Sequence, residues 1–208
     1  MSIIAQNKGG NFEIVPAGNH VARCYSMIEI GTIIDPTYQI PRTIVRVTWE
    51  LPNEKKVFKP ENGEQPFSIS KEYTLSMNEK ATLRKDLESW RGKGFTDKEA
   101  EAFDISKLLT VPCMLNVIHK KSNQGNQYAV VQSITPIPKG MSCPPQINPT
   151  FELSYGQWDD KKFAGLPEWL KEKMTQTKEF KAIVEGTAPD VGDEPVKDEQ
   201  GKFDDLPF

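Results

Sequence analysis

The chain has 208 residues, of which 26% are charged, and its formal net charge is -3. This length allows one substantial domain with appendages, and no run approaches the roughly 18 apolar residues that a membrane-spanning helix needs. The three cysteines, Cys24, Cys113 and Cys143, are too widely spaced to indicate a disulfide framework or a zinc site. We therefore expect a soluble intracellular protein with reduced thiols.

Charge is distributed unevenly along the chain. Residues 187–208 contain seven acidic and two basic residues, a net charge of -5, which leaves +2 on residues 1–186. The acidic segment has no sustained apolar period, so we expect a disordered tail. The predicted organisation is a domain over residues 1–137, a proline-rich strap with a C-terminal helix over residues 138–186, and the tail. The mildly basic body permits a polyanionic partner.

Three strands are predicted in the first part of the chain. The first runs from about His20 to Ile34 and is interrupted by Gly31, which is how a long strand of a small barrel bends to serve two sheets. The second, Thr43–Leu51, alternates apolar and largely polar residues, and the third, Phe67–Ser76, keeps the same period of two. Between the second and third strands, residues 52–66 are predicted to form a loop that is long enough to be a mobile flap.

The apolar period then changes to that of a helix. Leu83, Leu87 and Trp90 form a stripe, with Asn78 as the candidate N-cap. Thr96 opens a second short helix with a capping box. These helices form an insert after the third strand.

Two further strands, Thr110–His119 and Gln127–Pro136, form a hairpin with a basic loop. Three strands, a helical insert and two strands predict a mainly β fold, a five-stranded OB-fold-like Greek-key barrel with the helical insert between strands 3 and 4. A plain antiparallel sheet with a packed helix is the alternative. Trp49 and Trp90 each lie on an apolar stripe, so we expect both in the core.

The segment that follows the barrel is rich in proline. Residues 138–149 predict an irregular strap on the domain or a stiff linker. Pro167 then opens a helix that extends to Val184, with Trp169 and Leu170 on its partial apolar face. This helix is expected to dock on the barrel or on a neighbouring subunit, so a homo-oligomer is possible.

Catalytic chemistry has little support in the sequence. Neither His20 nor His119 adjoins an obvious nucleophile or a carboxylate at ligand spacing. No phosphate-binding loop, nucleophile elbow or zinc-protease motif occurs. Asp159 and Asp160 precede two lysines, which is typical of solvated loop charge. We expect no enzymatic activity, no cofactor and no metal.

Binding of single-stranded DNA needs cations for phosphates and aromatic faces for bases. Cationic and aromatic residues that share a strand face or a hairpin are the candidates: Arg23, Tyr25, Arg46, Lys71, Tyr73, Lys120, Lys121 and Tyr128. For each tyrosine, a place in the barrel wall is about as plausible as base stacking. Arg46 is the best single candidate, because a cation in the middle of a strand on its polar face has few structural reasons to be there.

The last five residues carry the most specific signal. Asp204 and Asp205 precede an apolar end formed by Leu206, Pro207 and Phe208, where a purely solubilising tail would have no apolar groups. A partner with an apolar pocket beside basic residues would take the Phe208 ring and pair with its carboxylate. This end closely resembles the acidic tip of bacterial and phage single-stranded-DNA-binding proteins. In that family the tip recruits replication and repair enzymes.

A basic OB-like body, a proline-rich strap and this acidic tip together resemble a phage-type single-stranded-DNA-binding protein. The resemblance implies a non-enzymatic protein that coats single-stranded DNA in replication or recombination, in the cytoplasm of a bacterial host. The alternative is an interaction adaptor that mimics such a tip without binding DNA. Only the tail residues correspond one by one to the family, so the DNA contacts above depend on the residues alone.

Overall fold

The computed structural model describes residues 13–35 and 39–187. The predicted tail, including Asp204–Phe208, lies outside the described part of the chain. The strands are β1 (Gly18–Ile34), β2 (Pro41–Val57), β3 (Glu64–Thr74), β4 (Pro112–Lys121), β5 (Gln127–Thr135) and β6 (Phe151–Leu153). The helices are α1 (Thr82–Arg91), α2 (Asp97–Glu101), α3 (Asp160–Ala164), α4 (Glu168–Thr175) and α5 (Lys178–Glu185), with short 3-10 turns at Pro60–Asn62 and Ile105–Leu108.

The described fold is mainly β, with one sheet in the strand order β3-β2-β1-β4-β5 and antiparallel neighbours. β1 is its central strand. On one edge β1 pairs with β2, while on the other its residues Gly18–Arg23 pair with β4 and its residues Ser26–Ile28 pair in parallel with β6. The pairing with β2 shifts register twice, once beside Gly31, whose φ of 103° favours glycine. β1 runs unbroken through Gly31, and the irregularity predicted there is this register shift.

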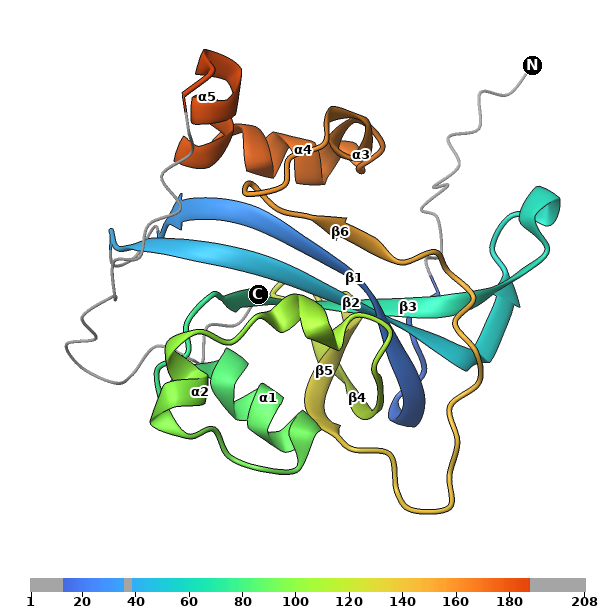
Figure 1. Cartoon of the computed structure of the whole chain (residues 1–208). Coiled ribbons are helices and arrows are strands. Elements are labelled where there is room, and N and C mark those ends of the chain that lie inside the picture. Colours follow the sequence, from blue (N-terminus) through green and yellow to red (C-terminus); the bar gives the residue numbers. More distant parts are fainter. Residues whose placement is uncertain (1–12, 36–38, 188–208) are drawn as a thin grey trace, which may run out of the picture.

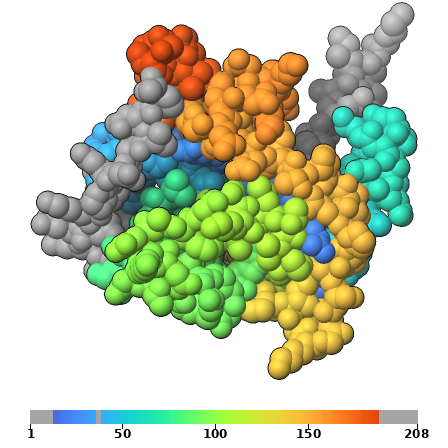
Figure 2. Space-filling model, viewed as in Figure 1, coloured from blue at the N-terminus to red at the C-terminus, as the bar shows by residue number. Residues whose placement is uncertain are grey.

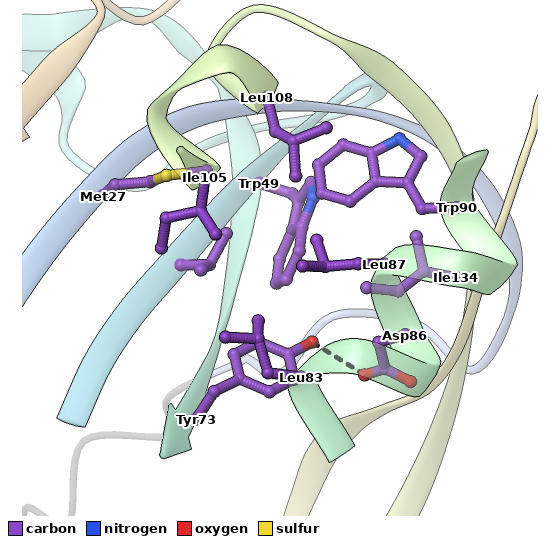
Figure 3. Close-up of a pocket in the computed structure, with 11 residues that line it drawn as sticks. Met27, Trp49, Tyr73, Leu83, Asp86, Leu87, Trp90, Ile105, Leu108 and Ile134 are labelled. Carbon is purple, nitrogen blue, oxygen red and sulfur yellow. Dashed lines mark hydrogen bonds between the residues drawn. The ribbon is translucent and has the colours of Figure 1, made fainter. Parts of the chain in front are cut away.

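The inner face of the sheet packs against α1 and forms the first of two apolar cores. Leu83, Leu87 and Trp90 of α1 are buried in this core. The Trp49 and Trp90 rings are in contact, tilted at 53° with centroids 5.9 Å apart; Figure 3 shows the pair. Trp49 is fully buried and Trp90 nearly so, which confirms that both belong to the core. Burying side chains of this size contributes roughly 1.5–3 kcal/mol each.

The second core lies on the outer face of the sheet. It contains Ile28, Ile30 and Ile44 from the strands and Leu153, Tyr155, Leu166, Leu170 and Met174 from the chain after the strap. We call residues 151–187, with β6 and α3–α5, the appendage. Figure 1 shows α3–α5 on the side of the sheet away from α1 and α2. The predicted C-terminal helix therefore docks on the sheet.

One carboxylate beneath the appendage makes stability depend on pH. Burial raises the pKa of Glu29, which the backbone N–H of Tyr155 lowers and the nearby Glu179 raises. Because the pKa of Glu29 is higher in the folded state, protonated Glu29 stabilises the fold. This contribution is complete below the unfolded-state pKa of about 4.3 and is lost as the pH rises through the folded-state pKa.

Glu29→Gln should therefore raise the urea midpoint at pH 7.5, because the amide oxygen still accepts from Tyr155 and the half-buried charge at this position is removed. The gap between variant and wild type should narrow as the pH falls and should close below the unfolded pKa of about 4.3. A gap that widens on acidification would contradict the role of Glu29.

The strap, residues 138–149, lies on the outer face of the sheet rather than extending as a linker. Its anchor is Glu50, a fully buried carboxylate on β2. Glu50 accepts hydrogen bonds from the backbone N–H groups of Ile147 and Asn148 and from the Asn148 side chain, each at 2.7 Å. Figure 2 shows the strap and the appendage as a yellow, orange and red band along one side of the molecule.

The segment between the second and third predicted strands is a paired hairpin, so the prediction of a flap over residues 52–66 is wrong. β2 continues to Val57 and β3 begins at Glu64, with these two residues in register. The charged composition misled the prediction, because a hairpin exposed on both faces needs polar side chains and is held by backbone hydrogen bonds.

Two helix boundaries also differ from the prediction. The predicted helix from Pro167 to Val184 is divided into α4 and α5, because Thr177 caps α5 by accepting from the backbone N–H of Phe180. Asn78 forms a turn with Lys80 instead of capping α1. The capping box of α2 is confirmed. None of the described helices is long and apolar enough to cross a membrane.

Candidate nucleic-acid interface

A strip of polar side chains faces outward from β2 and β3. Arg46 and Thr48 of β2 lie opposite Glu72 and Ser70 of β3, and Ser68 follows on the same face. The hydroxyl groups of Thr48 and Ser70 are hydrogen-bonded to each other at 2.9 Å. The strip faces outward because the alternate residues of both strands fill the inner core, as the period of two requires. It supplies hydroxyl and guanidinium donors on one surface.

An exposed tryptophan lies at one end of this strip. The Arg46 guanidinium stacks over the ring of Trp169 on α4, 4.8 Å from its centroid. Trp169 is 49% exposed. Arg46 also donates to Glu72 at 3.3 Å, and Lys173 of α4 pairs with the same carboxylate at 2.5 Å. Two cations share one carboxylate, so this group has a net positive charge beside an accessible aromatic face.

A tyrosine lies at the other end of the strip. Tyr25 occupies a bulge in β1, where the pairing with β2 shifts register between Cys24 and Ser26. Its hydroxyl donates to Ser68 at 3.4 Å, and its ring is half-buried. We call Tyr25, Arg46, Ser68, Ser70 and Trp169 the outer patch. It combines two aromatic side chains, a cation and hydroxyl groups on the β2–β3 face.

Of the predicted DNA contacts, Tyr25 and Arg46 belong to the outer patch, whereas Arg23 binds the protein itself. Arg23 donates to the backbone oxygen of Thr110 at 2.5 Å and to that of Pro144 in the strap at 3.0 Å. Its guanidinium therefore has a structural role. Arg46 too has structural partners in Glu72 and Trp169, contrary to the expectation that few structural reasons place it there.

Lys71 and Tyr73 point to the inner face, which corrects their prediction as DNA contacts. Tyr73 is buried, and its hydroxyl donates to Asp86 of α1 at 2.8 Å (Figure 3). Lys71 donates to the same carboxylate at 2.7 Å. Burial raises the pKa of Tyr73, with Asp86 adding to the shift. The Tyr73 ring is not available to stack on a base, because it shares the inward face of β3 with Phe67 and Ile69.

Lys120, Lys121 and Tyr128 come together at the β4–β5 hairpin. Lys120 pairs in register with Tyr128, and both lysines are exposed. The hairpin extends beyond Gly18, the first residue of β1, whereas Tyr25 lies beyond the other end of the β1–β4 pairing. The structure therefore places these three residues at a second location, separate from the outer patch.

Sequence reasoning missed three residues of the outer patch, Ser68, Ser70 and the aromatic Trp169. The prediction assigned it to the apolar face of its helix, but Leu170 and Met174 occupy that face and Trp169 points away from it. The available signal was the spacing of four between Leu170 and Met174, which excludes residue 169 from a narrow stripe. Val184, at the predicted end of that helix, is also exposed.

The histidines bind backbone groups near the start of the described chain. His20 Nε2 lies 2.8 Å from the oxygen of Pro16, and His119 Nε2 lies 2.8 Å from that of Val15. Asp159 accepts from the first N–H groups of α3. Over residues 13–35 and 39–187, no cluster of three or more histidine, cysteine or acidic side chains is arranged to hold a metal ion.

No protein-family model, curated protein or solved structure matches this chain. The geometry of the outer patch and the residues of the tail are therefore the observations that bear on function.

Proposed function

We propose that this chain is a non-enzymatic single-stranded-DNA-binding protein of phage or prophage origin, acting in DNA replication or recombination in a bacterial cytoplasm. The observation that carries the proposal is the outer patch, where Trp169 and Tyr25 lie at the two ends of a hydroxyl-lined strip that contains Arg46. Bases stack on aromatic faces and phosphates need cations, and the outer patch supplies both.

The strand order supports an OB-like Greek-key barrel. An OB-fold is a partly open five-stranded barrel that binds oligonucleotides on the face of its second and third strands and with its L12 and L45 loops. Here β1 lies between β2 and β4, the helices α1 and α2 lie between β3 and β4, and β3 comes close to β5, where such a barrel would close. The strip of the outer patch lies on β2 and β3, and Lys120 and Lys121 end β4, next to the β4–β5 loop that would correspond to L45.

The mode of binding follows from the chemistry of the outer patch. Successive bases would stack on Trp169 and Tyr25, each contributing about 1–3 kcal/mol. Arg46 and Lys173 would hold phosphates, and the hydroxyl groups of Ser68 and Ser70 would donate hydrogen bonds to the strand. Because stacking accepts every base, we expect little sequence preference.

A fluorescence titration tests the proposal. An oligothymidylate should quench tryptophan emission, and the affinity should fall steeply with salt as counterions are released. A duplex of the same length and heparin are the controls, since neither offers unpaired bases. Binding of the single strand no tighter than binding of heparin at low salt would refute the proposal.

We also propose that the tail, Asp204–Phe208, recruits replication or repair enzymes. The support is the sequence of the tail alone. The full chain coupled to beads should retain such enzymes from a bacterial extract, and Phe208→Ala should release them while leaving DNA binding intact. Equal retention by both proteins, measured by mass spectrometry, would contradict recruitment by the tail.

A further inference from the structure

The strap divides the outer face of the sheet into two regions. It crosses β1 where Cys143 approaches the backbone oxygen of Ala22, with Sγ at 3.7 Å, and where Arg23 binds Pro144. Tyr25 and the outer patch lie beyond this crossing. Before it, an open hollow of about 550 Å³ is lined by Asn19, His20, Val21, Asn53, Glu54, Met114, Pro138, Met141 and Ser142. The strap thus forms one wall of the hollow.

The lining of this hollow suits a flat, largely uncharged group. Val21, Met114 and Met141 provide apolar surface, and the amides of Asn19 and Asn53 provide donors and acceptors. Its lining contains no lysine or arginine, so a phosphate inside it would have no counter-charge. Its volume falls within the roughly 300–1,000 Å³ of typical small-ligand sites, which have mainly apolar walls and few polar groups. Thioether side chains adapt to flat ligands.

Cations lie next to the hollow rather than in it. Lys55 follows Glu54 along β2, and Lys139 follows Pro138 in the strap, and both lysines are exposed. Lys56, which follows Lys55 on β2, pairs with Glu13. The hollow has one carboxylate, Glu54, whose Oε1 lies 3.3 Å from Nδ1 of His20 in the same lining. A pocket without cations of its own, with cations in the adjoining chain on two sides, matches the division of a nucleotide into a neutral base and an anionic phosphate.

We propose that the hollow takes one unstacked base of the bound single strand, with the adjacent phosphates held by Lys55 and Lys139. This inference depends on the proposed function and adds a second contact point to it. The strand would run from the outer patch across the strap to the hollow. The thioethers of Met114 and Met141 would contact the base plane, and the amides of Asn19 and Asn53 would contact the base edge.

The test fills the hollow. Ser142→Trp places an indole in it from an exposed position, and Ala164→Trp, at an exposed position on α3, is the matched control. A 20-residue oligothymidylate should bind Ser142→Trp about five- to tenfold more weakly than wild type, the loss expected for one stacked base. Ala164→Trp should bind as wild type does, and an oligonucleotide composed of abasic sites should bind all three proteins equally.

A second measurement needs no substitution. An oligothymidylate carrying 5-iodouracil should, on irradiation, cross-link to peptides that contain residues 19–21 or 138–142. If the wild-type protein binds no single-stranded DNA, the proposed function itself fails. If it binds, but Ser142→Trp binds equally well and these peptides carry no cross-link, only the base pocket is refuted.

The acidic tail is the other candidate occupant of the hollow. If the hollow is protected from hydrogen exchange without DNA, and truncation after Gly186 removes that protection, the hollow belongs to the tail. That result would overturn the base pocket as well.

Discussion

Glu50→Gln should lower the free energy of unfolding by about 2–4 kcal/mol, because a buried carboxylate that accepts three N–H donors is replaced by an amide whose NH2 group faces some of them. The donors at Ile147 and Asn148 are then left partly unsatisfied away from water. Since these bonds hold the strap, hydrogen exchange of residues 138–149 should increase more than that of β2. Urea unfolding and exchange mass spectrometry measure the two effects.

Glu61→Gln is the matched control for this substitution. Glu61 is an exposed glutamate at the tip of the β2–β3 hairpin, so the same chemical change there should alter stability by less than about 0.5 kcal/mol. If Glu50→Gln is as stable as Glu61→Gln, the strap is not anchored through Glu50. If stability falls without faster exchange in the strap, the buried charge matters for β2 alone.

Trp169→Ala should weaken binding of an oligothymidylate by about tenfold, the loss expected when one base loses its stacking partner. Stability should change little, because half of the Trp169 side chain is exposed and Leu170 and Met174 fill the core behind it. Trp169→Phe should retain most of the affinity, since a smaller aromatic face remains. Fluorescence anisotropy with a labelled oligonucleotide measures all three proteins without relying on tryptophan emission.

Val184→Ala is the control for this second substitution. Val184 is more exposed than Trp169 and lies on α5 of the same appendage, so its removal tests a general effect of trimming the surface. Equal affinity of Trp169→Ala and wild type would remove Trp169 from the interface. A parallel loss in Val184→Ala would indicate a disturbed appendage rather than a lost stacking contact.

The alternating strands could be predicted because each contains its own signal. The apolar residues of β2 recur with a period of two, and Trp49 and Trp90 lie on apolar stripes, so both were correctly placed in the core. The same alternation also argued against Tyr73 as a DNA contact, because Tyr73 shares a face with Phe67 and Ile69. Lys71 lies on that same face, where Asp86 of α1 pairs with it.

The features that could not be predicted depend on contacts between distant parts of the chain. Nothing near Glu50 in the sequence indicates that Ile147 and Asn148 will cover it. The position of Trp169 over Arg46 likewise depends on how the appendage docks, which a helical period alone does not determine. Predictions from local periodicity were therefore correct for the inner core and incomplete for the outer face.

The shared edge of β1 also has a consequence for synthesis. Ser26 pairs with Phe151, so that part of the edge has no partner until the chain has been made past β6. At translation rates of about 5–20 residues per second, this delay lasts on the order of 10 s. An uncovered strand edge is a template for pairing with other chains. Expression at high yield should therefore favour aggregation during translation, and slower initiation or a ribosome-bound chaperone should increase the soluble fraction.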